Sequence, residues 1–278
     1  MKFGDEDVLY EIRGPKSIFE MSVPELEKEM GQAEIVLLAC GSTEPHGPHL
    51  PLGADVLQGL YLLRRIVKRL EEFGVRAIAG PTIPFGLRTN LYERPQPWPG
   101  NIYLSAPVYY GLLRELCLRF IEMGFLKIGL VVSHVENEPI LHSVAKELAD
   151  NKGAQIVVAN WVKPLWNHYR EILRSQRREG HAGEGETARV MAVAPKLVQL
   201  EGVKPYYTET VKEATIEEDT LPYFGGSVGI YFPWRHDTAN PGFNGDPNLA
   251  TTEVGEKNYD VMSDWISQVI NTDFRGAI

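Results

Sequence analysis

The sequence predicts an α/β fold in which helices cover both faces of a mostly parallel β-sheet. Four short apolar runs have the length and composition of strands buried on both faces; they cover residues 35–39, 75–79, 127–132 and 155–159. Longer segments with helical spacing separate these runs, which is typical of parallel strands joined by helical crossovers. A loop rich in glycine and proline directly follows the first run, at the edge where sheets of this type bind ligands.

The expected elements follow one another in a regular order. The first long helix is expected from Asp55 to Phe73, where Asp55 can cap the start and Gly74 follows the last turn. Further helices are expected at 106–123, 139–149, 187–194 and 252–269. Two stretches, 81–101 and 203–249, have no sustained period, and loops of this length in a compact domain are commonly functional.

Length and composition limit both the architecture and the partners. A chain of 278 residues with 44% hydrophobic content can bury one large core, so we expect a single domain over 1–278. The formal charge of -9 argues against nucleic acid and anionic membrane surfaces as partners. Two cysteines, and an acidic start without a signal sequence, indicate a reducing, cytoplasmic setting.

The densest cluster of ligand-type residues lies in the loop 41–55. Glu44 and His46 are two apart, so in an extended segment both side chains face the same way, and Asp55 can join them after a turn. Mixed histidine and carboxylate ligands suit Zn or Mn. The alternative is a structured loop in which Asp55 only caps the helix and the histidines lie on the surface. The spacing alone leaves both interpretations open.

A second cluster follows the strand expected at 127–132. His134 and Glu136 again place a histidine and a carboxylate two apart, and neighbouring parallel strands deliver such pairs to one crevice. Taken alone, they are equally explained as a loop histidine and a carboxylate that favours a helix start. Together with the first cluster they give five candidate ligands, enough for two ions that share one bridging carboxylate.

A third element runs from Gly180 to Thr187, just before an expected helix. Its glycine pattern differs from a dinucleotide-binding motif, and its two carboxylates would repel phosphate. His181 is a candidate proton donor or acceptor because histidine titrates near neutral pH. Glu184 and Glu186 either favour the helix start only, or one of them orients His181 or contacts a metal.

Other histidines and aromatic residues are weaker candidates. Trp98, Trp161 and Trp234 can line a pocket, although large aromatic residues commonly pack in cores and interfaces. His49, inside the first motif, is a candidate to support the metal ligands. His236 lies in the long stretch 203–249 and is a weaker candidate for a functional role.

These motifs resemble those of the creatininase family. The loop 41–55 closely resembles the first metal motif of the family, 133–137 its second ligand segment, and 180–187 its third motif. Residues 98–101 are similar to a Phe-Pro-Gly-Thr turn of the family, and 245–247 to its carboxyl-terminal signature. The resemblance therefore extends from the first strand to the final helix.

The resemblance implies a three-layer α/β/α sandwich, assembly as a homohexamer, and two divalent ions per chain, Zn or Mn with Fe as an alternative. It assigns one ion to Glu44, Asp55 and His134. It assigns the other to His46, Asp55 and Glu136, so that Asp55 forms the bridge. The chain departs from the family pattern at two positions that are not ligands, Pro45 and Ser133.

The implied reaction is two-metal hydrolysis of an amide, cyclic or formyl, in a small polar molecule. His181 would protonate the leaving group, assisted by the glutamates of its motif, while Trp161 and Trp98 contact the substrate. A second tryptophan of the family's pocket falls at Arg177, so we expect a substrate more polar or anionic than creatinine. Two alternatives remain: a C–C hydrolase that opens a cyclic diketone derived from inositol, and a non-catalytic metal-binding structural subunit.

Overall fold

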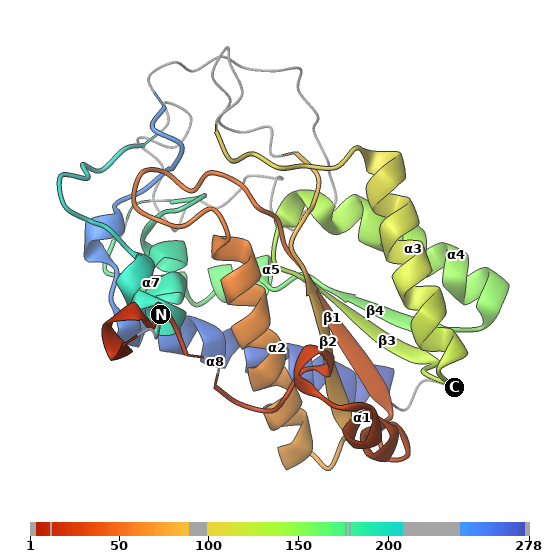
Figure 1. Ribbon diagram of the computed structural model, residues 1–278. Helices are drawn as coiled ribbons and strands as arrows, with labels where there is room; N and C mark the ends of the chain where they lie inside the picture. Colours follow the sequence, from red (N-terminus) through yellow and green to blue (C-terminus); the bar gives the residue numbers. More distant parts are fainter. Residues whose placement is uncertain are drawn as a thin grey trace.

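The computed structural model of the protein describes residues 4–11, 13–88, 99–175, 177, 179–207 and 240–275. Its centre is a parallel sheet of four strands in the order β2-β1-β3-β4 (Figure 1). The strands are β1 (Ile35–Cys40), β2 (Ala77–Ile83), β3 (Lys127–Val132) and β4 (Gln155–Ala159). The expected parallel sheet is thus confirmed. Only β2 differs clearly, because an irregular register opposite Leu37 lets the strand continue past Pro81.

Eight α-helices lie in the described residues. They are α1 (Val23–Met30), α2 (Ala54–Glu72), α3 (Ala106–Glu122), α4 (Glu138–Lys152), α5 (Val162–Trp166), α6 (Tyr169–Ile172), α7 (Glu184–Val193) and α8 (Thr252–Val269). Helices α3 and α4 cover one face of the sheet, while α2 and α8 cover the other, with α7 packed beside α8 (Figure 1). This is the expected α/β/α sandwich.

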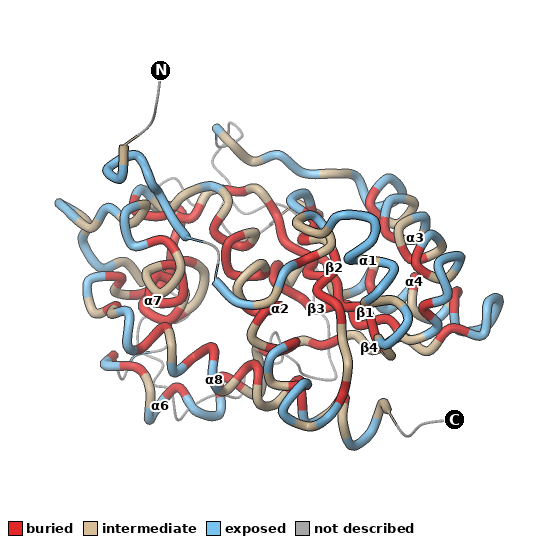
Figure 2. The backbone as a smooth tube through the Cα atoms, turned by 60° about the horizontal axis from the view of Figure 1, so that its bottom comes forward, coloured by how far each residue is buried: buried red, intermediate tan, exposed pale blue. Residues whose placement is uncertain are grey.

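The central strand β1 contributes to the cores on both faces of the sheet. All six of its residues are buried, and Figure 2 shows β1 in the buried centre of the protein. The odd-numbered residues of β1 pack with α2 and α8, whereas the even-numbered residues pack with α3 and α4. Because each fully buried large aliphatic side chain contributes about 1.5–3 kcal/mol, a strand covered on both faces requires a continuous apolar run.

Three short helices, α1, α5 and α6, were not expected. Helix α1 nevertheless has a sequence signal: Ser22 caps it, and the side chain of Glu25 accepts a hydrogen bond from the Ser22 backbone N–H at 2.8 Å. Helices α5 and α6 are too short to show a period. Helix α7 starts at Glu184, three residues before the expected Thr187, so its first turn includes Glu186.

The start of α2 settles one alternative for Asp55. Gly53 is the N-cap of α2, and Asp55 lies inside the first turn, so its interpretation as a capping residue is wrong. Of the aromatic and histidine candidates, Trp98, Trp234 and His236 lie outside the residues that the structure describes. Within the described part of the chain, no helix has the length and hydrophobicity to cross a bilayer.

The order of the strands creates a crevice between β1 and β3. From β1 the chain passes through α2 to β2 on one side, and from β3 it passes through α4 to β4 on the other side. Neighbouring strands whose connections leave in opposite directions open a gap at their carboxyl ends, where α/β proteins bind ligands. The two strand-end motifs of the sequence meet at this gap.

Candidate metal centre

One candidate metal site joins residues that follow β1 and β3. Glu44 comes from the loop after β1, Asp55 from the first turn of α2, and His134 from the end of β3. The Nδ1 atom of His134 lies 3.4 Å from Glu44 Oε1 and 3.2 Å from Asp55 Oδ2. All three side chains are buried, and they form one group that can hold a metal ion.

A second candidate site lies on the other oxygen of Asp55. The Nε2 atom of His46 is 3.4 Å from Asp55 Oδ1 and 3.9 Å from Glu186 Oε1. His46, Asp55 and Glu186 therefore form a second group that can hold an ion. Because the two oxygens of Asp55 face different histidines, this carboxylate has the geometry of a bridge between two ions.

Backbone carbonyls fix the orientation of both histidine rings. His46 Nδ1 donates to the carbonyl of Glu44 at 3.0 Å, and His134 Nε2 donates to the carbonyl of Leu87 at 3.0 Å. A carbonyl can only accept, so in the neutral rings the opposite nitrogens carry lone pairs. These lone pairs, on His46 Nε2 and His134 Nδ1, face the carboxylates. Such outer hydrogen bonds commonly set the tautomer of metal-binding histidines.

The spacing and the unused lone pairs of the cluster fit bound cations. With metal–ligand distances near 2.1 Å, two ligands of a tetrahedral ion lie about 3.4 Å apart, close to the separations around Asp55. Two buried atoms, Glu44 Oε2 and His46 Nε2, complete no hydrogen bond with any residue that the structure describes. Buried polar atoms are rarely left in this state, so these two atoms fit an external partner such as a bound cation. Mixed nitrogen and oxygen donors suit Zn or Mn.

The negative charge of the cluster also favours bound cations. Burial disfavours a charged His46, but Asp55 and Glu186 outweigh burial and raise the pKa of His46 to about 10. Burial likewise opposes ionisation of Asp55, yet the neighbouring His46 and His134 hold the pKa of this carboxyl below its usual value. Without a metal, the carboxylates thus attract protons onto the histidines. Divalent cations supply the missing positive charge in another form.

His181 reaches the same cluster from the loop before α7. Its Nε2 atom donates to the carbonyl of Pro45 at 2.7 Å, so in the neutral ring the lone pair is on Nδ1. Nδ1 lies 3.8 Å from Glu44 Oε1 and 3.8 Å from Glu186 Oε2. His181 also forms a group with Glu44 and His46 that can hold an ion. The geometry therefore allows two roles for Nδ1, proton transfer or metal ligation.

The turn that carries His181 contains a strained residue. Ala182 has a φ of 50°, in the left-handed region that costs a residue other than glycine about 1–3 kcal/mol. Its N–H donates to Glu186 Oε2 at 2.7 Å, and its carbonyl accepts from His49 Nε2 at 3.0 Å and Thr187 Oγ1 at 3.3 Å. Burial lowers the pKa of His49 to about 4, so the ring is neutral at pH 7. His49 thus holds the turn that carries His181.

The three candidate glutamates occupy different places. Glu186 joins the second candidate metal site, where the sequence resemblance had placed Glu136. Glu136 lines the same pocket but belongs to none of the ligand groups among the described residues. Glu184 is fully buried, and its two oxygens accept the backbone N–H groups of Arg174 at 2.7 Å and Ser175 at 2.8 Å. Its geometry supports a structural role and not the expected catalytic one.

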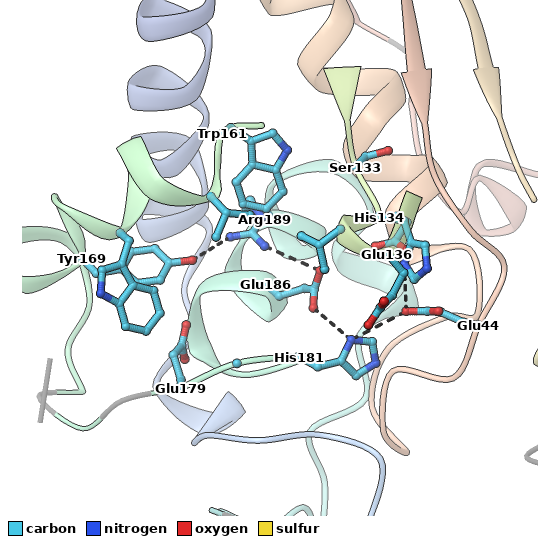
Figure 3. A pocket seen from close by; sticks show the side chains of 15 residues that line it. Glu44, Ser133, His134, Glu136, Trp161, Tyr169, Glu179, His181, Glu186 and Arg189 are labelled. Atoms are coloured by element: carbon cyan, nitrogen blue, oxygen red, sulfur yellow. Dashed lines mark hydrogen bonds and ion pairs between the residues drawn. The ribbon is translucent and has the colours of Figure 1, made fainter. Parts of the chain in front are cut away.

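The pocket extends from the ligand cluster to a second end with different chemistry (Figure 3). The cavity has a volume of about 100 Å³. Residues from α5, α6, α7 and the adjoining loops line this end: Trp161, Trp166, Tyr169, Glu179 and Arg189. Burial, reinforced by the neighbouring Glu184, raises the pKa of Glu179 to about 8, so this carboxyl is protonated at pH 7.

The expected substrate contacts are only partly in place. Trp161 lines the pocket, as expected, with its indole N–H donated to the carbonyl of Val132. Arg177 is exposed, stacks 3.8 Å from the centre of the Tyr207 ring, and is not among the residues that line the pocket. The guanidinium in the pocket belongs instead to Arg189. The sequence carried one usable signal for it, since Arg189 lies one helical turn after Glu186 and shares its face.

Fold and site together define the class of protein: an α/β enzyme with a candidate metal centre at the carboxyl edge of its sheet. The family model for creatininase, described as creatinine amidohydrolase, matches residues 19–270. The chain therefore belongs to the creatininase family and is a metal-dependent hydrolase.

Relatives within the family act on different molecules. Creatinine amidohydrolase from Pseudomonas putida is 24% identical, over 93% of this chain and 98% of the relative. A 3-dehydro-scyllo-inosose hydrolase from Thermotoga maritima is 21% identical, over 90% of this chain and 81% of the relative. A crystal structure of creatininase superposes with a TM-score of 0.72 at 22% identity, covering 95% of this chain and all of that one. Solved creatininases include a manganese form and a variant of Zn-Zn type.

Proposed function

We propose that the protein hydrolyses an amide bond, cyclic or formyl, in a small polar molecule with two divalent ions, Zn or Mn. The proposal rests on Asp55, whose Oδ1 and Oδ2 face His46 and His134 respectively. One tetrahedral ion needs four ligands, whereas this cluster offers more than four around one shared carboxylate. Ions held there would polarise a carbonyl and activate water, which is the chemistry that amide hydrolysis requires.

The chain's own residues would orient the substrate and transfer the proton. His181 presents Nδ1 to the pocket, where it can accept a proton and deliver it to the departing nitrogen. Its bond to the carbonyl of Pro45 prevents the ring from turning away during this transfer. The aromatic walls formed by Trp161 and Tyr169 exclude water, and so strengthen electrostatic interactions inside the pocket.

The pocket favours a substrate other than creatinine. Beside Trp161 it holds the charged Arg189 and Glu186, and the second tryptophan that encloses creatinine in the family is replaced by Arg177. One relative is named as a hydrolase of 3-dehydro-scyllo-inosose, a cyclic polyhydroxylated ketone. This name supports a second candidate function, hydrolytic C–C cleavage that opens a cyclic diketone.

Metal content and turnover, measured on the same preparation, test the proposal. After saturation with Zn or Mn, elemental analysis should find two ions per chain. A panel of cyclic amides, formamides, cyclic diketones and creatinine should give its highest kcat/KM, at or above ~10⁴ M⁻¹s⁻¹, on an amide other than creatinine. Turnover of diketones alone would establish the second function. A metal-saturated protein without any turnover would support the non-catalytic subunit instead, and one ion at saturation would contradict the two-metal site.

The same proposal covers the organisation of the protein. We propose that residues 1–278 form one domain, since the four strands form one sheet and the family match covers residues 19–270. By resemblance to the family we expect a homohexamer, which light scattering would measure. Cys40 and Cys117 are both free and buried, in keeping with a reducing cytoplasm.

A further inference from the structure

Arg189 is a buried cation in the wall of the pocket, and the proposed hydrolysis gives its side chain no role. It lies on α7, is 3% exposed, and lines the pocket next to Glu186 of the second candidate metal site. Figure 3 shows its guanidinium between Tyr169 and Glu186. Its Cζ lies 4.6 Å from the centre of the Trp161 ring, so the guanidinium makes a cation–π contact with one face of the indole.

The guanidinium is held in a fixed orientation yet keeps unused donors. Its Nε donates to Gln58 Oε1 at 2.6 Å, and Nη1 donates to the hydroxyl of Tyr169 at 3.3 Å. Nη2 only approaches Glu186 Oε1, at 3.6 Å, which is too long for a direct hydrogen bond. Arginine has five N–H donors. Among the described residues, Arg189 therefore makes two hydrogen bonds and retains three N–H groups at the pocket.

Glu186 does not need Arg189 to hold its position. Gln58 Nε2 donates to Glu186 Oε1 at 3.1 Å, and the Ala182 N–H donates to Glu186 Oε2 at 2.7 Å. When a cation occupies the second candidate site, the negative charge of Glu186 is directed to that cation. Arg189 is then a buried positive charge whose nearest counter-charge is already engaged. Such a group is stabilised strongly by an incoming anion.

We propose that Arg189 is the specificity-determining residue of the pocket and binds a carboxylate of the substrate. The substrate class is a small amide or formamide whose carboxylate lies only a few bonds from the scissile carbonyl, because the single side chain of Glu186 separates Arg189 from the ligand cluster. A carboxylate matches the planar fork of donors on the guanidinium. The proposal rests on the proposed amide hydrolysis.

The size and walls of the pocket agree with this class. A cavity of about 150 Å³ accommodates benzene, so a cavity of about 100 Å³ takes only a small molecule. Tyr169 accepts from Arg189 and keeps its own O–H available as a further donor to an anion. The ring of Trp161 packs against the charge and Trp166 packs beside Tyr169, so these aromatic walls lower the local dielectric and strengthen the attraction of Arg189 for a carboxylate.

The experiment compares substrates that differ only in charge. The probes are N-formylglycine with its neutral analogue N-formylglycinamide, and pyroglutamate with pyroglutamide. Metal-saturated protein should prefer the carboxylate of at least one pair by ~10–100-fold in kcat/KM, the range expected for hydrogen bonds to a charged group. Calorimetric binding of all four probes, to metal-free and metal-loaded protein, gives a second readout that does not need turnover.

Four variants, at three arginines, locate the effect. Arg189→Gln should reduce the preference to within about threefold, mainly through KM, while two ions remain bound; Arg189→Lys, which keeps the charge without the fork, should retain an intermediate preference. Arg177→Gln tests the rival assignment and should keep the full preference. Arg119→Gln, on the exposed side of α3, controls for the loss of one positive charge. If Arg189→Gln does not fold, the substrate pairs on wild-type protein and Arg189→Lys still decide.

The outcomes separate this inference from the proposed function. Carboxylate binding that depends on Arg189, without turnover of any amide, would support the inference and count against amide hydrolysis. Turnover of neutral amides at rates equal to their carboxylate partners would overturn the inference and leave the function intact. Loss of metal in Arg189→Gln would also overturn it, since Arg189 would then only position Glu186.

Discussion

The two ends of the pocket are built in different ways. At the metal end, each ligand lies within a few residues of a strand end or in the first turn of a helix, so the backbone of the sheet positions it. At the other end, Arg189 is positioned by the side chains of Gln58 and Tyr169, which are distant in sequence. The metal end thus follows from local motifs, whereas the substrate end depends on how α2, α6 and α7 pack together.

The largest effect is expected from the residue that the two candidate sites share. Asp55→Ala should leave fewer than one ion per chain where two are proposed for wild-type protein, and turnover should fall below detection, because among the described residues only Asp55 belongs to both candidate sites. Elemental analysis after dialysis measures this, with Asp150→Ala on the exposed part of α4 as the control. Glu186→Gln should lose more metal than Glu136→Gln. The reverse order would return the second site to Glu136.

A smaller effect is expected where the two ends of the pocket meet. His181→Ala should keep the fold and both metals but lose ~10²–10⁴ in kcat, the usual contribution of a positioned acid or base. Single-turnover kinetics and metal content measure the two quantities, with the half-exposed His168→Ala as a matched control. Metal loss would make His181 a ligand. A wild-type rate would remove it from the mechanism.

The smallest effect concerns stability at the substrate end. Glu179 has a pKa raised to about 8 from 4.5, so between these values the folded state keeps a proton that the unfolded state has released. Its contribution to the free energy of unfolding therefore falls as pH rises through this window and is constant below it. The free energy of unfolding of Glu179→Gln should therefore rise progressively relative to that of wild type as the pH increases from 4.5 to 8. Denaturant titration of metal-free protein measures this, and an unchanged difference across the window would refute the buried neutral carboxyl.

The exposed Glu201→Gln controls for the loss of one carboxylate in that series. A parallel slope in this control would assign the effect to net charge and not to burial at Glu179.

The predictive power of the sequence follows the same division between the two ends. The strands were predictable because continuous apolar runs are required where a sheet is covered on both faces, as β1 shows. The grouping of Glu44, His46, Asp55 and His134 was predictable because parallel strands deliver their carboxyl ends to one edge. In each case a local pattern is sufficient.

The remaining assignments depended on packing that no local pattern reports. Arg177 is near His181 in sequence, but its side chain lies outside the pocket and stacks on Tyr207. Arg189 enters the pocket because α7 turns one face toward Trp161. Glu184 was expected to take part in catalysis because it lies in the motif of His181. At the start of α7, however, its carboxylate accepts hydrogen bonds from the backbone of the preceding loop.

The left-handed Ala182 links folding to the supply of metal. An isolated chain rarely places alanine in that conformation, and here the Ala182 carbonyl is bound by His49, from the loop after β1, so contacts from elsewhere in the fold stabilise the turn before α7. Loop, turn and ligand cluster therefore assemble cooperatively. Ions that bind only the assembled state add stability as their concentration rises, about 2.7 kcal/mol at one hundred times the Kd. In a cell, the free concentration of the metal would thus help to set the lifetime of the protein itself.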